Sequence, residues 1–140
     1  MSFWRFDKFG DLAVIMKREE LDKLAKQIIG IAIEIHKILG PGFVEKIYAK
    51  ALAYELSKNK MRFSKEKVIR VKYKDLLLGD QRVDFLIEDS LILELKAVSA
   101  INDIHLAQIL SYLKAADKRL GLILNFARGT LEIKRVANKF

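Results

Sequence analysis

The sequence predicts an α/β domain in which a mixed β-sheet is flanked by α-helices. Two amphipathic helical stretches open the chain, several strand-like stretches follow, and a further helical stretch separates the last two strands. A chain of 140 residues with 51% hydrophobic residues has enough apolar side chains for one continuous core. Because a helix connects the last two strands, we expect them to run parallel within a sheet that is otherwise a meander.

The first helix is predicted from Leu21 to Ile38, where apolar residues recur at steps of three and four. Gly40-Pro41-Gly42 ends it, and a second helical pattern follows at once. This pattern fades over residues 57–60. Its apolar stripe, which we expect to face the core, consists of Val44, Ile47, Ala51 and Tyr54.

The strands begin where the pattern changes to a period of two, at residues 69–74, with a basic outer face formed by Arg70, Lys72 and Lys74. Turns predicted at Lys74-Asp75 and Gly79-Asp80 would separate a short strand at residues 76–78 from another at residues 82–87.

An almost continuous apolar run from Leu91 to Val98 predicts a central strand buried on both faces. Residues 103–116 form a helical pattern that Ser99 or Asn102 could cap, and residues 120–126 predict a last buried strand.

Composition excludes several classes of protein. The chain has no cysteine, which excludes disulfides and thiolate metal sites and is compatible with the reducing cytoplasm, where we expect the protein to act. No apolar run approaches the roughly 18 to 20 residues of a membrane span, so no membrane association is expected. The net charge of +8 favours a polyanionic partner such as nucleic acid, although a basic, solvated surface explains it equally well.

Three ionisable residues interrupt the apolar strands. Asp84 lies within residues 82–87, and Glu94 and Lys96 lie within residues 91–98, where their spacing places them on one face of the strand. A buried charge is costly unless it is paired or bound to an ion. Two possibilities remain open at this point: an internal ion pair of Asp84 or Glu94 with Lys96 or Arg82, or a site for a hard divalent ion such as Mg²⁺.

Asp84, followed after a turn by Glu94-Leu95-Lys96, resembles the Asp…Glu-x-Lys signature of the PD-(D/E)XK nuclease superfamily. The helix that follows carries Gln108 and Tyr112, four residues apart on one face. In addition, residues 42–48 (Gly-Phe-Val-Glu-Lys-Ile-Tyr) match the pattern that names the GxxExxY protein family. The resemblance covers roughly residues 17–136.

The resemblance implies a restriction-endonuclease-like fold for a single domain over residues 17–140, preceded by an N-terminal extension over residues 1–16. Met16 would then be a candidate natural start. It also implies a nuclease that hydrolyses phosphodiester bonds in DNA or RNA with Mg²⁺ or Mn²⁺, and that acts as a homodimer.

The resemblance assigns a role to each candidate residue. Asp84, Glu94, the backbone carbonyl of Leu95 and Glu45 would hold the metal ion, and Lys96 would be the catalytic lysine. Gln108 and Tyr112 would touch substrate phosphate or support Lys96. The alternative is a catalytically inactive nucleic-acid-binding or protein-interaction module on the same fold.

Three further features have competing interpretations. Arg70, Lys72 and Lys74 are the best candidates for phosphate contacts, although a solvated basic face is nearly as well supported. His36 and His105 are expected to be structural, as helix-end groups, rather than part of the site.

Overall fold

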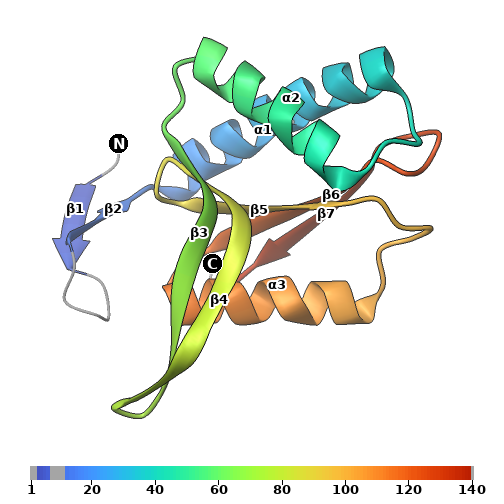
Figure 1. The fold of residues 1–140 in the computed structure, drawn as a ribbon. Helices are drawn as coiled ribbons and strands as arrows, with labels where there is room; N and C mark the ends of the chain where they lie inside the picture. Colours follow the sequence, from blue (N-terminus) through green and yellow to red (C-terminus); the bar gives the residue numbers. More distant parts are fainter. Residues whose placement is uncertain (1–2, 7–11, 140) are drawn as a thin grey trace.

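The computed structural model describes residues 3–6 and 12–139 and contains two sheets and three helices in this part of the chain (Figure 1). The elements run in the order β1 (Phe3–Phe6), β2 (Leu12–Ile15), α1 (Arg18–Leu39), α2 (Glu45–Lys58), β3 (Phe63–Tyr73), β4 (Leu76–Ile87), β5 (Leu91–Lys96), α3 (Asp103–Ala116), β6 (Leu120–Asn125) and β7 (Glu132–Ala137).

The main sheet has five strands in the order β3-β4-β5-β6-β7. Strands β5 and β6 are parallel and are joined by α3, as the helix between them predicts, while the other neighbours are antiparallel. The predicted mixed α/β sheet flanked by helices is therefore confirmed. Within the described residues, no helix is long and apolar enough to cross a membrane.

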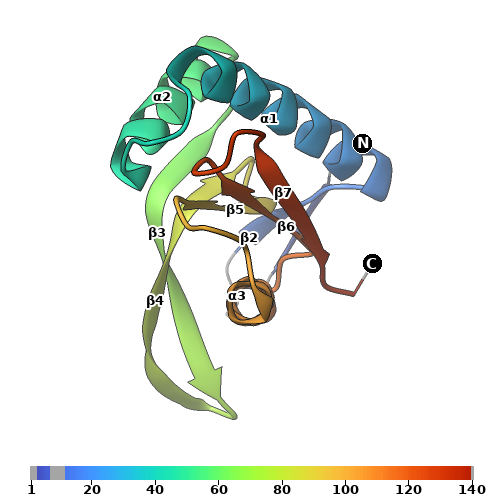
Figure 2. The same ribbon diagram turned by 90° about the vertical axis from the view of Figure 1, so that its right-hand side faces the viewer.

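The helices cover the sheet from both sides (Figure 2). Helices α1 and α2 pack on one face against side chains such as Phe85 and Leu93, and α3 packs on the other against Ile92 and Ile123. Because side chains alternate along a strand, β5 and β6 are buried on both faces. A Cβ at Gly121 would lie 2.7 Å from the Ile109 Cδ1, so glycine permits the close approach of α3.

The predicted inner face of α2 is wrong. Val44, Ile47 and Tyr54 are exposed, and the buried side chains are instead Tyr48, Leu52 and Leu56. The sequence of α2 carries two apolar stripes of helical spacing. Its packing against α1 and the sheet buries the stripe formed by Tyr48, Leu52 and Leu56.

The predicted turn at Gly79-Asp80 is also wrong, whereas the turn after Tyr73 is present. Gly79 pairs with Val71 and Asp80 pairs with Arg70, so β4 continues unbroken from Leu76 to Ile87. Pairing with β3 keeps this segment extended despite its local turn preference.

Among the described residues, β1 and β2 pair only with each other and form a hairpin separate from the main sheet. One ion pair, Arg5 to Asp117 at 3.6 Å, links it to the end of α3. Residues 1–2 and 7–11 of the predicted extension lie outside the described residues.

We predict that a chain starting at Met16 keeps its fold. An exposed ion pair such as Arg5–Asp117 contributes at most about 1 kcal/mol, so the free energy of unfolding should change little. Urea denaturation would measure it, and a chain starting at Ala25, which loses the buried Leu21 and Leu24, should be clearly destabilised. Aggregation or loss of the transition in the longer truncated chain would contradict this domain boundary.

Candidate active site

The candidate site lies where β4 and β5 separate. The two strands pair only from Phe85 to Ile87 on β4 and from Leu91 to Leu93 on β5. One step further, the same register would place Asp84 opposite Glu94, but no pairing occurs there. The ladder is therefore open where two acidic side chains would face each other. We call this opening the fork.

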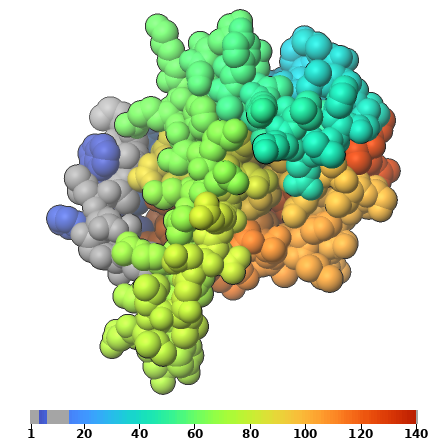
Figure 3. All heavy atoms as spheres, in the orientation of Figure 1, coloured from blue at the N-terminus to red at the C-terminus, as the bar shows by residue number. Residues whose placement is uncertain are grey.

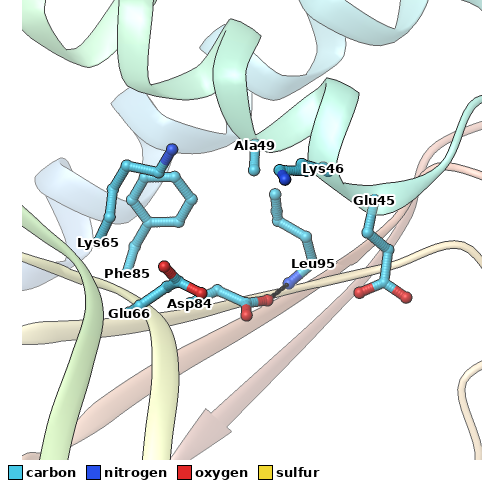
Figure 4. A pocket seen from close by; sticks show the side chains of 8 residues that line it. All are labelled: Glu45, Lys46, Ala49, Lys65, Glu66, Asp84, Phe85 and Leu95. Carbon is cyan, nitrogen blue, oxygen red and sulfur yellow. Dashed lines mark hydrogen bonds between the residues drawn. The ribbon is translucent and has the colours of Figure 1, made fainter.

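The Asp84 side chain takes the place of the missing ladder bond. The Leu95 N–H donates to Asp84 Oδ2 at 2.8 Å, which Figure 4 shows as a dashed line. The N–H and C=O of one residue point to the same side of a strand, so the Leu95 carbonyl also faces the fork. Asp84 and the Leu95 carbonyl therefore present oxygen atoms to the same opening.

Glu94 lies on β5, the other strand of the fork, and is buried. Its side chain is 7% exposed, and its Oε1 has no hydrogen-bond partner. Burial raises the pKa of Glu94 from its usual 4.5 to about 9, and the neighbouring Asp84 carboxyl adds to the rise, while Lys96 opposes it. A buried carboxyl with an unsatisfied oxygen is a local cost to stability.

Lys96 and Tyr112 lie on the same side of the sheet as Glu94. Lys96 is half-buried and follows Glu94 by two residues, so the two side chains share the face that α3 covers. Burial raises the pKa of the Tyr112 hydroxyl, and the charges of Glu94 and Asp84 add to that rise, which places this hydroxyl near both acids. Gln108, one turn earlier on α3, is exposed.

The internal ion pair, the alternative that the sequence leaves open, does not form in this geometry. Among the residues that the structure describes, neither Asp84 nor Glu94 lies within ion-pair distance of Lys96 or Arg82. The burial of these carboxyls is therefore not compensated by a direct contact with a cationic side chain.

Glu45 approaches the fork from the opposite face. It is the first residue of α2 and lines a cavity of about 340 Å³ together with Asp84 and Leu95 (Figure 4). Because Glu94 faces α3 and Glu45 comes from α2, the three carboxylates do not converge. In the described part of the chain, no three His, Asp or Glu side chains are close enough to form a ready metal site.

Tyr48 fixes the loop from which Glu45 starts. Its hydroxyl donates to the Gly40 carbonyl at 2.6 Å and accepts from the Phe43 N–H at 3.2 Å, and its ring stacks on Phe126 at 4.3 Å. Gly42, at φ +116°, adopts a conformation that other residues rarely reach. The Gly-x-x-Glu-x-x-Tyr spacing thus holds the start of α2 in place, with the tyrosine buried rather than in the site.

Both histidines have structural contacts, but only His105 acts at a helix end, as predicted. His36 Nε2 donates to the Arg128 carbonyl at 2.8 Å. The His105 ring Nδ1 accepts from the Asn102 N–H and, with the Asn102 side chain, caps α3. Asn102, rather than Ser99, is the helix cap.

Besides Glu45, Asp84 and Leu95, the cavity is lined by Lys46, Ala49, Lys65, Glu66 and Phe85. Lys46 is adjacent to Glu45 in the matched pattern, so the sequence contained a signal for it. Glu66 lies on β3, where its φ of +50° interrupts the regular ladder opposite Asp84. No periodicity in the sequence reveals that interruption.

The comparison with protein families supplies the assignment. Residues 22–136 match the sequence profile of the PD-(D/E)XK nuclease superfamily. The chain belongs to this superfamily. The matched segment contains Glu45, Asp84, Glu94 and Lys96, and it excludes the β1-β2 hairpin.

This PD-(D/E)XK protein shares its fold with two solved structures. SSO0001 is similar with a TM-score of 0.53 and 16% identity, over 68% of this chain and 50% of SSO0001. The chain therefore spans half the length of that protein. An alkaline exonuclease, LHK-Exo from Laribacter hongkongensis, has a TM-score of 0.50 and 9% identity, over 89% of this chain and 72% of the exonuclease. No curated protein sequence gives a significant match.

We predict that Glu94→Gln stabilises the metal-free protein at alkaline pH. Since the pKa of Glu94 is about 9 when folded and 4.5 ordinarily, the folded chain binds more protons between these values. Wild-type stability should then fall as pH rises through this window, whereas the amide does not ionise. At pH 8 in EDTA, we expect the variant to be more stable by roughly 1–3 kcal/mol, and by less at pH 5, in urea denaturation.

Glu132 provides a control of opposite sign. A hydrogen bond from Asn125 lowers the pKa of Glu132, so its contribution to stability is present at neutral pH and is lost as pH falls below the ordinary value. Glu132→Gln should therefore destabilise the protein more at pH 8 than in acid. Equal destabilisation by Glu94→Gln at pH 5 and pH 8 would contradict the burial that raises the Glu94 pKa.

Proposed function

We propose that this protein is a nuclease of the GxxExxY branch that hydrolyses phosphodiester bonds in DNA or RNA with Mg²⁺ or Mn²⁺. The observation that carries the proposal is the Glu94 carboxyl, which is buried beside Asp84 with an oxygen that has no partner. A divalent ion at the fork explains why two acids are kept together there despite their cost.

The donor set at the fork fits a hard cation. Asp84, Glu94 and the Leu95 carbonyl provide oxygen atoms, which Mg²⁺ and Mn²⁺ prefer, and leave positions for water. Glu45 stands across the cavity and would join through a water molecule or by a rotation of its exposed side chain. Three carboxylates would then face three positive charges, two on the ion and one on Lys96.

When bound, the ion would polarise a phosphoryl oxygen and lower the pKa of a bound water. Lys96, on the same face as Glu94, orients the attacking water or stabilises the charge that develops on phosphate. Tyr112 closes this side of the fork and supports Lys96, while the exposed Gln108 contacts substrate phosphate.

The same proposal includes the substrate contacts, the cellular location and the oligomeric state of the protein. Arg70, Lys72 and Lys74, which project from β3 and the turn after it, contact backbone phosphates. The protein acts in the cytoplasm. It forms a homodimer, because one small domain offers only a short surface for a long substrate. Sedimentation of the purified protein measures the oligomeric state.

We predict metal-dependent cleavage of nucleic acid. Labelled single- and double-stranded DNA and RNA incubated with Mg²⁺ or Mn²⁺ should be cleaved, and EDTA should abolish cleavage. Glu94→Gln and Lys96→Ala should each lower the rate by about 100-fold or more, because the first weakens the metal site and the second removes a positive charge near the reacting phosphate.

Matched controls are Glu34→Gln and Lys23→Ala, two positions on α1 that lie outside the site. These variants should cleave at the wild-type rate. Intact substrate under every condition would sink the nuclease proposal. Binding that falls steeply with salt, needs no metal and survives Glu94→Gln would identify an inactive nucleic-acid-binding module instead.

A further inference from the structure

The outer part of the β3-β4 hairpin projects from the body of the protein. In Figures 1 and 3 it extends beyond both α3 and the rest of the sheet. Ile69 and Val83 are the last buried residues of the hairpin, and both pack in the cluster that includes Ile109 and Tyr112 of α3. From Arg70 to Arg82 only Val71 is half-buried, and the other residues are exposed. We call residues 70–82 the arm.

The end of the arm is apolar. Tyr73 is 60% exposed, and the three leucines after the turn, Leu76, Leu77 and Leu78, are 63%, 54% and 60% exposed. Successive side chains of a strand point to opposite faces, so the leucines cover both faces of the arm. A contiguous exposed apolar group of this kind marks a surface that a partner covers.

Basic residues surround this apolar tip. The arm carries four basic residues, Arg70, Lys72, Lys74 and Arg82. It carries only two acidic residues, Asp75 and Asp80. The Lys74 ammonium lies 5.4 Å from the centre of the Tyr73 ring. An apolar tip among cationic side chains is complementary to a ligand with a polyanionic backbone and an apolar interior, which is the chemistry of a nucleic acid.

The arm is also continuous with the candidate active site. Strand β4 runs unbroken from Leu76 to Asp84 and pairs with β3 over most of this length, with a register shift between Val71 and Lys72. At about 3.3 Å per residue, the leucines lie roughly 20–26 Å from Asp84 along the strand. This span corresponds to roughly six to eight nucleotides at 3.4 Å each.

We propose that the tip of the arm is a wedge that inserts between base pairs of duplex DNA, roughly six to eight nucleotides from the phosphodiester at the fork. Three of the four apolar side chains at the tip are leucines, which have no ring on which a single-stranded base could stack, and apolar wedges flanked by basic residues unstack and bend duplexes. The position relative to the cleaved bond rests on the proposed function, but the insertion itself does not.

The experiment measures base unstacking directly. DNA duplexes of 30 base pairs carry 2-aminopurine at successive positions, and the protein is Glu94→Gln in EDTA, so that no cleavage intervenes. Binding should raise the fluorescence at one step. A triple variant that adds Leu76→Gln, Leu77→Gln and Leu78→Gln should lose this rise and bind the duplex about ten-fold more weakly. Its salt dependence should be unchanged, because no charge is removed.

Control variants distinguish insertion of the leucines from charge attraction and from a general loss of surface apolarity. Ile38→Gln changes an isoleucine that is 71% exposed on α1, and it should alter neither fluorescence nor affinity. Lys72→Gln with Lys74→Gln should reduce the salt dependence but keep the rise. Leu77→Gln alone, checked by circular dichroism, gives a milder version of the triple variant should the latter fold poorly.

Other outcomes would overturn the proposal. An unchanged duplex affinity with no fluorescence rise would exclude a wedge, and a rise on an RNA duplex alone would exclude DNA. A triple variant that turns a dimer into a monomer without affecting DNA binding would assign the tip to a second copy of the chain. The wild-type cleavage assay is separate: absent cleavage with a clear fluorescence rise would refute the nuclease proposal and leave the wedge standing.

Discussion

Strands β4 and β5 stop pairing at the point where Asp84 and Glu94 would face each other across a closed ladder. The opening gives the Asp84 side chain access to the Leu95 N–H, and the Leu95 carbonyl, which points to the same side of the strand, faces the same space. It also releases β4 from the central sheet, so that its outer part pairs with β3 alone and becomes the arm. The site and the arm therefore follow from one interruption in strand pairing.

The surrounding core compensates for this interruption. Leu91, Leu93 and Leu95 pack under α1 and α2, while Ile92 packs under α3, so β5 is held on both faces up to the fork. Buried Glu94 is destabilising in the absence of a cation, and a strand anchored in this way can tolerate that cost. In the proposed site, stability and function are thus opposed at a single side chain, as is common at catalytic sites.

The parts of the fold that the sequence predicts well are those with a strong local pattern. The long helix α1, the helix α3 and the parallel strands β5 and β6 are all present at the predicted positions. The inner face of α2 is wrong because its sequence has two apolar stripes, and only tertiary packing distinguishes Tyr48 from Ile47. Strand β7 escapes prediction because its residues are mostly polar and partly exposed. The roles of Asp84, Glu94 and Lys96 remain predictions, since the sequence places acids in buried strands but cannot show that the ladder opens between them.

A crystal soaked in Mn²⁺ tests the central claim most directly, because manganese is located by its anomalous scattering. We expect one ion within about 2.0–2.3 Å of carboxylate oxygens of both Asp84 and Glu94 and of the Leu95 carbonyl. In Glu94→Gln crystals treated in the same way, the ion should be lost. An empty fork in the wild type, with Asp84 and Glu94 unchanged and manganese bound elsewhere, would contradict the account.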